Sequence, residues 1–304
     1  MDGFKLIKNY ESSEIFVDLD EHQEYEINGF FRKIINFSLV SCLNLLPAAS
    51  QKIIKKTHKD AKKVIDNKTT HEALEVLYKH PERKRKENFV QKIARKIWFE
   101  LDNSRSVRNR LKLVKKIFEK TVLDLKDSHE TIKVLSIASG SSRALLEVLS
   151  NLDIKNEIIL KFLDKSTHAV EYSKKVTASL FGNKFTNYKT EWILDTANSF
   201  PKYWNGQKID IIEMVGLLDY FDDEKVLKIF TSIFNNLSDG GTLISANIAN
   251  NKERKFLTKV VGWDMVYKTP EQFVDLATNA GFDRKKISIV SEPLNIHFVL
   301  IAQK

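Results

Sequence analysis

The amino-acid sequence predicts an α/β protein with a helical N-terminal region followed by a mostly parallel sheet. Before residue 130, apolar residues recur at helical spacing, and no strong strand pattern is present. After residue 130, short apolar runs alternate with helical patterns, as in doubly wound sheets. Residues 131–149 (TIKVLSIASGSSRALLEVL) join a strand to a helix through a turn of small residues. Because such a turn opens the cofactor site of a Rossmann-like sheet, we expect that fold class.

The composition is that of a globular protein with an excess of basic residues. The chain has 304 residues, of which 42% are hydrophobic and 29% charged, and its net charge at pH 7 is +9. Such a charge suits an anionic partner, either nucleic acid or a membrane surface. Lys and Asn are spread along the whole chain, however, and only parts of the N-terminal third concentrate basic residues. We therefore interpret most of the charge as a general compositional bias.

Cysteine content and hydropathy predict an intracellular protein. Cys42 is the only cysteine, which excludes disulfides within the chain and zinc sites made of cysteines. No pair of histidines has zinc-ligand spacing, so we expect no metal. The N-terminus lacks the apolar region of a signal peptide, and the segment 34–46 is too short and too polar to span a bilayer. We expect a cytoplasmic protein without a transmembrane segment.

The N-terminal region is expected to be helical after a loose arm formed by residues 1–20. Pro47 ends one periodic run, and Thr69 with Glu72 forms a capping box that opens another. The segment 82–101 is basic and amphipathic. We favour a solvated basic face opposite a core stripe over a surface for a membrane or RNA. The expected helices span 24–46, 48–65, 69–77, 82–101 and 107–125, and the expected domains are 1–104, a helical cap or substrate domain, and 105–304, the cofactor-binding domain.

Seven strands and their connecting helices are expected after residue 130. The connection 292–295 is too short for a crossover, so the last two strands must pair antiparallel and only the final strand should oppose the others. Residues 239–241 (DGG) are expected to form the turn before the fifth strand. The expected strands are 132–137, 158–163, 188–194, 209–214, 242–248, 287–291 and 297–302, with helices at 166–181, 223–237 and 270–280.

Acidic residues follow successive strands at the edge where such a sheet binds ligands. Asp164 follows the second strand, where a carboxylate can accept both hydroxyls of a ribose. Asp195 follows the third strand, within reach of an adenine amine, and the fourth strand ends in 216–221 (GLLDYF). Each acid alone is a common cap or turn former. Their succession next to a small-residue turn favours one shared functional site.

This order of features resembles the class I S-adenosylmethionine-dependent methyltransferases over about 131–304. The resemblance is most specific in 237–243 (LSDGGTL) and in the final antiparallel pair, which distinguish these enzymes from NAD-binding Rossmann domains. Within the family, the chain resembles a bacterial group of methyltransferases with a helical N-terminal extension. That narrower resemblance rests on GLLDYF, on 247–254 and on Trp263 before 267–270 (YKTP).

The resemblance implies S-adenosylmethionine as the cofactor and a role for each matching residue. It also reveals a departure, because the acid that usually helps to hold the cofactor's amino group in the first strand is Ser136 here. Glu213 or Asp219 would have to make that contact. Ala138 and Ser142 stand where the family has the outer glycines of the turn. The implied cofactor residues are Ala138, Ser139 and Gly140 at the methionine part, Asp164 at the ribose, Asp195 and Thr196 at the adenine, and Glu213 to Gly216 under the sulfonium.

The implied reaction is an in-line displacement at the sulfonium methyl group, for which the protein aligns the reactants and excludes water. A carboxylate acceptor needs no base. An alcohol or amine needs a proton acceptor, for which Asp219 is the candidate, with Tyr220 as a hydrogen-bonding or stacking partner. Arg105, Arg108 and Arg110 precede the first strand, and one of them is expected to hold the carboxylate of the cofactor or of the substrate.

The expected acceptor is a small or lipid-like molecule methylated at a hydroxyl or carboxyl group and oriented by Tyr220 and one arginine. The apolar stripes of 30–46 and 89–98 would cover the edge of the sheet and form its pocket, although they also suit packing on each other and on the sheet. Two alternatives stay open. One is an RNA-binding or RNA-modifying methyltransferase, favoured by the basic segment 82–96, and the other is transfer of another group, such as aminopropyl, on the same scaffold.

Overall fold

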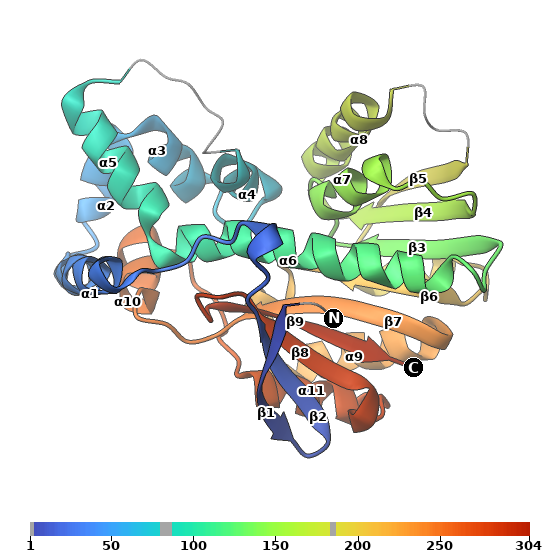
Figure 1. The fold of residues 1–304 in the computed structure, drawn as a ribbon. Helices are drawn as coiled ribbons and strands as arrows, with labels where there is room; N and C mark the ends of the chain where they lie inside the picture. The colour runs from blue at the N-terminus through green and yellow to red at the C-terminus, as the bar shows by residue number, and fades with distance from the viewer. Residues whose placement is uncertain (1–2, 80–86, 183–186) are drawn as a thin grey trace.

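A mixed sheet forms the centre of the computed structural model, which describes residues 3–79, 87–182 and 187–304 (Figure 1). Within these residues the sheet has nine strands. In sheet order they are β1 (Phe4–Tyr10), β2 (Ser13–Asp18), β8 (Ile287–Ser291), β9 (His297–Gln303), β7 (Leu237–Ile248), β6 (Ile209–Met214), β3 (Thr131–Ile137), β4 (Glu157–Asp164) and β5 (Tyr188–Leu194).

The strands after residue 130 have the directions that the sequence predicts. β3 pairs parallel with β4 and β6, and the parallel pairing continues to β5 on one side and β7 on the other. β9 is antiparallel to both of its neighbours, β7 and β8, so the expectation for the final strand is confirmed. β7 begins earlier than expected, because the residues of the predicted turn form an irregularity inside the strand: Leu237 pairs with Ile209, and Thr242 pairs with Ile211.

An N-terminal β-hairpin extends the sheet, and the predictions of a loose arm, of no strand before residue 130 and of a seven-stranded sheet are wrong. β2 pairs parallel with β8, with Glu14 opposite Ser288, and β1 lies antiparallel at the edge. The hairpin turn holds Glu11 (φ 44°) and Ser12 (φ 77°) in the left-handed region. Asn-Gly or Asp-Gly usually marks such a turn, so Glu-Ser carries no signal for it. β1 is also exposed along most of its length, which removes the alternation of a half-buried strand.

Helices cover both faces of the sheet, and alternate side chains of each strand enter two separate cores. Val134 of β3 packs in the core shared with α6 (Asp102–Leu125), α7 (Arg143–Asn151) and α8 (Thr167–Phe181). Leu135, its neighbour in sequence, packs in the core shared with α9 (Asp223–Asn236) and α11 (Pro270–Asn279). This alternation follows from the two-residue period of a strand.

The remaining helices gather beyond one end of the sheet and share a third apolar core with the start of α6 (Figure 1). Residues 4–18 thus join the sheet, whereas the helices between residues 30 and 100 form the helical part of the N-terminal region. None of the described helices is both long and apolar enough to cross a membrane. The members of this group are α1 (Phe30–Leu45), α2 (Ser50–Thr57), α3 (Lys59–Asp66), α4 (His71–Tyr78), α5 (Phe89–Glu100) and α10 (Arg254–Phe256), and short helical turns occur at Glu21–Gln23, Ala197–Tyr203, Leu218–Tyr220, Leu257–Val261 and Arg284–Lys286.

Two of the predicted helices differ from the observed ones. The predicted helix 48–65 is divided into α2 and α3 at His58, whose Nδ1 accepts the backbone N–H groups of Asp60 and Ala61. His58 therefore acts as an N-cap, a role seldom assigned to histidine from sequence. The predicted helix 82–101 is described from Phe89 onward as α5, and residues 82–86 lie outside the described residues.

Candidate active site

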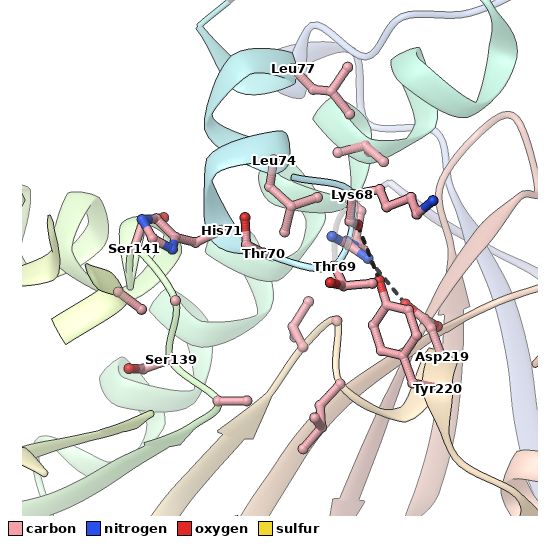
Figure 2. A pocket seen from close by; sticks show the side chains of 18 of the residues that line it. Lys68, Thr69, Thr70, His71, Leu74, Leu77, Ser139, Ser141, Asp219 and Tyr220 are labelled. Atoms are coloured by element: carbon pink, nitrogen blue, oxygen red, sulfur yellow. Dashed lines mark hydrogen bonds and ion pairs between the residues drawn. The ribbon is translucent and has the colours of Figure 1, made fainter. Parts of the chain in front are cut away.

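A cavity of about 770 Å³ lies at the carboxyl edge of the sheet, between the strands and the N-terminal helices. Figure 2 shows Leu74 and Leu77 of α4 on one side of this cavity and Ser139 of the turn after β3 on the other, with His71 of α4 reaching toward Ser141. The structure brings all the predicted cofactor residues to this one cavity. They are Ala138, Ser139, Gly140, Asp164, Asp195, Thr196, Glu213 and Gly216, and the predicted catalytic residues Asp219 and Tyr220 line it as well.

The turn after β3 is tight because three of its residues have left-handed backbone conformations. Ala138, Gly140 and Ser142 have φ angles of 52°, 54° and 54°. Gly140 is needed at its position, since a Cβ atom there would lie 3.3 Å from the Cβ of His71 on top of the unfavourable φ. Ala138 and Ser142 adopt a conformation that costs an ordinary residue roughly 1 kcal/mol. The turn thus keeps the shape that glycines would give it, although only one glycine is present.

Asp164 is held in place by the backbone at the end of β4. Its carboxylate accepts the backbone N–H of Gly140 (2.9 Å) and that of Ser166 (2.9 Å). Asp195, at the end of β5, accepts the hydroxyl of Tyr203 (2.6 Å) and pairs with Lys202. Lys202 and Tyr203 hold the pKa of Asp195 well below its usual value. Both side chains are therefore held in fixed orientations at the carboxyl edge of the sheet.

Glu213 of β6 lies beside Ser136 of β3, where the two strands pair directly. The Ser136 hydroxyl donates to the Glu213 carboxyl group at 2.5 Å, and both residues are buried. Burial raises the pKa of Glu213 to about 7, although Ser136 and the nearby Arg110 act in the opposite direction. A carboxyl group from the neighbouring strand thus lies beside Ser136.

Arg110 of α6 is a buried cation that faces the cavity. Its Nη1 lies 3.9 Å from the carboxylate of Asp219, and its Nε and Nη2 have no hydrogen-bond partner among the described residues. The backbone of Gly216 passes close by, since a Cβ atom there would lie 3.9 Å from Nη2. A buried guanidinium with free donors is costly unless an anion binds to it. Arg110 is therefore the strongest candidate for an anion-binding group in the site.

Asp219 and Tyr220 follow β6 and point toward the helical side of the cavity (Figure 2). The Asp219 carboxylate accepts the backbone N–H of Ile248 (3.1 Å), and burial raises its pKa above the usual value. The Tyr220 hydroxyl accepts the indole N–H of Trp263 (2.9 Å) and donates to the carbonyl oxygen of Lys68 (3.5 Å). Burial raises the pKa of Tyr220 to about 12, so its hydroxyl is neutral and acts as a hydrogen-bonding group.

Two of the predicted substrate residues, Arg105 and Arg108, do not line the cavity. Arg108 Nη2 donates to Glu26 (2.7 Å) and to the carbonyl oxygen of Phe99 (2.9 Å), and Arg105 donates to the carbonyl oxygen of Ile27 (2.7 Å). These two arginines attach the chain before α1 to the side of α6. Helical periodicity alone could have distinguished Arg110 from these two arginines. The side of α6 that faces the cavity carries the apolar residues 107, 111 and 114, and Arg110 lies on that side.

The apolar wall of the cavity differs from the one that the sequence predicts. Of the stripes 30–46 and 89–98, only Trp98 is among the described residues that line it. α1 packs instead on the outside of the third core, through Val40. The wall comes mainly from α3, α4 and the segment after β7, which sequence reasoning did not select because their contact with the turn is made only by tertiary packing. The apolar lining includes Val64, Leu74, Leu77, Trp98, Leu101, Phe256, Leu257, Val261, Trp263 and Met265.

His71 is a further site residue that the sequence interpretation missed. It opens α4, lies against Gly140 and lines the cavity, and burial lowers its pKa. No sequence signal links it to a turn about 70 residues later. Among the described residues, no group of three His, Cys, Asp or Glu side chains is arranged to hold a metal ion.

The seven strands after residue 130 and the cavity at their carboxyl edge define the class I methyltransferase fold. The family described as "Putative methyltransferase" matches residues 65–304, and the chain belongs to this family. The prediction of a class I S-adenosylmethionine-dependent methyltransferase is confirmed by this family together with this fold. A narrower assignment to a group with a helical N-terminal extension is not made by these comparisons.

Solved structures with the same fold are distant in sequence. Magnesium protoporphyrin IX methyltransferase from Synechocystis PCC 6803, with bound S-adenosylhomocysteine, is 14% identical with a TM-score of 0.54, covering 80% of this chain and 99% of that one. Its structure with bound S-adenosylmethionine has a TM-score of 0.51 and covers 80% and 96% at 14% identity. A protein from Bordetella parapertussis, described as a possible exported protein, is 15% identical with a TM-score of 0.59, covering 77% and 79%. No curated protein matches the chain.

Proposed function

We propose that this chain transfers a methyl group from S-adenosylmethionine to a small or lipid-like acceptor that carries a carboxylate or hydroxyl group. The observation that carries the proposal is one cavity with two unlike walls. One wall is polar and is built by residues at the carboxyl ends of β3, β4, β5 and β6, whereas the other is apolar and is built largely by helices. A polar cofactor and an apolar acceptor can therefore meet in the same enclosed space.

The polar wall suits the nucleoside part of S-adenosylmethionine. Asp164, oriented by two backbone N–H groups, would accept the ribose hydroxyls. Asp195 and Thr196 would lie at the adenine, and the turn 138–140 would lie against the methionine part. These assignments follow the order of the strands along the sheet edge, which is the order of the parts of the cofactor.

The methionine end of the cofactor carries an ammonium and a carboxylate, and buried groups of both complementary charges line the cavity, with Glu213 and Arg110 nearest to where that end would lie. Glu213 would bind the ammonium, because it occupies the space beside Ser136 where the family's usual acid would project. Arg110 would bind the carboxylate with its free Nε and Nη2 donors. The fit of these two residues, neither of which has a full set of partners inside the protein, supports S-adenosylmethionine as the ligand.

We assign Arg110 to the cofactor and not to the acceptor on chemical grounds. A guanidinium that pairs with a reacting carboxylate withdraws charge from the nucleophile and slows its attack on the methyl group. Pairing with the spectator carboxylate of the cofactor has no such penalty. The acceptor would instead be oriented by the neutral Tyr220 hydroxyl, which Trp263 and Lys68 hold in position.

The bound cofactor supplies a methyl group that is already activated by its sulfonium. The protein then has to align the acceptor and exclude water, which the apolar wall does. A carboxylate acceptor needs no proton transfer. A hydroxyl acceptor loses a proton, and Asp219 would receive it, since burial raises the pKa of Asp219 above that of an exposed aspartate and so makes it a stronger base.

We further propose that the helices between residues 30 and 100 act as the substrate domain over a cofactor domain that begins near residue 105. Leu74 and Leu77 of α4 and Trp98 at the end of α5 supply part of the apolar wall, so changes at these three residues would alter the choice of acceptor without altering cofactor binding.

Transfer of labelled methyl groups from S-adenosylmethionine to defined acceptors tests the proposal. The panel should contain fatty acids, hydroxy fatty acids and aromatic acids, with single-stranded and transfer RNA as competing acceptors. Methyl esters or ethers of the acids would support it. Labelling of RNA alone, or transfer of an aminopropyl group in place of methyl, would overturn it in favour of one of the alternatives.

A further inference from the structure

Large apolar side chains are exposed on three helices at one end of the molecule. On α1, Phe30, Phe31, Ile34, Ile35, Phe37 and Leu45 are exposed, with Phe31 at 79% and Leu45 at 82%. α2 adds Ile53, and α5 adds Phe89 and Ile93. We call the solvent-facing sides of α1, α2 and α5 the helical end face. A group of neighbouring exposed apolar side chains like this one marks an interaction site.

α1 is apolar around most of its circumference. Val40 is buried in the third core, so one side of the helix already has its partner inside the protein. The opposite side shows aromatic and aliphatic groups to solvent. The polar residues between positions 34 and 42 are the exposed Ser38 and Ser41 and the half-buried Asn36, which donates to Asp102 of α6 (2.8 Å). A helix that is apolar all round is normally covered on every side. The outward side of α1 therefore lacks its partner.

The three helices lie together, away from β5 and the adenine end of the site (Figure 1). Arg32 of α1 donates to the carbonyl oxygen of Glu100 at the end of α5 (3.1 Å) and forms an ion pair with its carboxylate, which joins the two helices. None of the exposed apolar residues of the helical end face lines the cavity. Trp98 on the inward side of α5 does line it, so this helix separates the cavity from the helical end face.

The charge of the helical end face identifies the partner. α1, α2 and α5 contain two, three and three basic residues, and their one acid is Glu100, which is paired with Arg32. Exposed lysines flank the apolar groups at positions 33, 52, 56, 92 and 96. Arg32, Lys55 and Arg95 are paired with Glu100, Asp66 and Glu87. A second copy of this chain would bring the exposed lysines face to face with the same lysines. Nucleic acid would need several cations interleaved with the aromatic groups. α1 itself has none from residue 34 to residue 45, and Lys252, whose Nζ lies 5.3 Å from the centre of the Phe37 ring, is a single cation from outside the helix.

We infer that the helical end face docks on an anionic lipid bilayer, with α1 lying in the plane of the interface. Its apolar side chains would enter the boundary between headgroups and acyl chains, and the flanking lysines would meet the anionic headgroups. This arrangement places the apolar cavity one helix away from the lipid. The inference stands apart from the proposed function, because its residues and those of the cofactor site do not overlap.

Flotation of the full chain with vesicles tests this inference. The vesicles are phosphatidylcholine alone, or a three-to-one mixture of phosphatidylcholine and phosphatidylglycerol. The protein should float with the mixed vesicles and much less with phosphatidylcholine alone, and added salt should weaken the binding. Phe31→Ser combined with Ile35→Ser should reduce binding at least about tenfold. Lys52→Glu combined with Lys56→Glu should reduce binding to the mixed, anionic vesicles to a similar extent and leave the weak binding to phosphatidylcholine alone unchanged.

Two matched variants serve as controls. Leu6→Ser with Ile7→Ser changes exposed apolar residues on β1, and Lys285→Glu changes an exposed lysine far from α1, so both should bind vesicles like the unchanged protein. All variants should retain S-adenosylhomocysteine affinity, which shows that they fold. Absence of flotation with the mixed vesicles would overturn the inference. A dimer or an RNA complex that Phe31→Ser with Ile35→Ser dissolves, without vesicle binding, would assign the face to that partner instead.

Discussion

Ser136 and Glu213 sit opposite each other on the adjacent parallel strands β3 and β6, and the serine hydroxyl donates to the glutamate carboxyl group at 2.5 Å. The class I pattern has an acid at the position of Ser136. In this chain the carboxyl group comes from the next strand, and a serine fills the space that the acid leaves. Under the proposed function, Glu213 would therefore take the place of the family's acid beside the cofactor's amino group.

We expect cofactor affinity to depend on pH through Glu213. Its pKa is raised to about 7, so it is largely protonated at pH 6 and ionised at pH 8. An ammonium group bound beside it favours the ionised form, so binding releases a proton at low pH and becomes tighter as pH rises. Calorimetry with S-adenosylhomocysteine should show about tenfold tighter binding at pH 8 than at pH 6. Glu213→Gln should bind weakly and almost equally at both values; an unchanged pH dependence in this variant would refute the assignment.

The same carboxyl group should make the cofactor-free protein less stable at high pH. Its pKa is higher in the folded state than in the unfolded state, so its contribution to stability is fully present below about pH 4.5 and is lost as pH rises through about 7. Between pH 5 and pH 8 the unchanged protein should lose about 2 to 3 kcal/mol that Glu213→Gln does not lose. Urea unfolding of both proteins at the two pH values measures the difference. Parallel pH profiles for the two proteins would show that Glu213 does not titrate in this range.

Arg110 and Arg108 should differ in their effect on cofactor affinity. Arg110→Met removes free donors from the cavity, so it should weaken S-adenosylhomocysteine binding by about 1.5 to 3 kcal/mol, and it should also lower the stability because it leaves the buried Asp219 without its nearby cation. Arg108→Met breaks the bonds to Glu26 and Phe99, so it should lower the unfolding temperature and leave the affinity unchanged. 5′-Methylthioadenosine, which lacks the amino-acid part, should bind equally to all three proteins. Equal weakening of both ligands by Arg110→Met would place this arginine elsewhere in the site.

Asp164→Ala should weaken both S-adenosylhomocysteine and 5′-methylthioadenosine, because both contain the ribose. The expected loss is about 1 to 3 kcal/mol, that of a charged hydrogen-bonding partner. Gly140 and Ser166 donate to different oxygens of Asp164, so Asp164→Asn keeps an acceptor for only one of these N–H groups and one acceptor oxygen for the ribose, and it should show a smaller loss than Asp164→Ala. Asp239→Ala, on a fully exposed side chain, is the matched control. Calorimetry that gives the same affinities for Asp164→Ala and for this control would exclude the ribose assignment.

The sequence predicted the parts of the fold and site that depend on local patterns. The strand, turn and helix around Gly140 and the acid at Asp164 are each visible within a few residues of chain, and the parallel order follows from the alternation of strands and helices. The pairing of Ser136 with Glu213 needs the register of two strands, although the sequence did offer Glu213 as a substitute. Arg110 could have been separated from Arg105 and Arg108 by helical phase alone.

The missed features all arise from contacts between distant segments. His71 reaches Gly140 only because α4 packs against the turn. The stripe of α1 was expected over the cavity, but apolar periodicity does not say which apolar side of a helix faces the protein when both sides are apolar. The hairpin of β1 and β2 was hidden because its turn is Glu-Ser and its edge strand is exposed.

The pairing of β2 with β8 has a consequence for the order of folding. Glu14 and its partner Ser288 are separated by 274 positions in the chain, so Ser288 is synthesised long after Glu14. During synthesis the hairpin therefore has no β8 to pair with until the later segments are made. Ile15 and Val17, which are buried in the folded protein, stay exposed to solvent during that time. Closing a loop of that length costs entropy before any contact repays it. Docking of the hairpin should thus be a late event, and nascent chains are exposed to aggregation until it occurs.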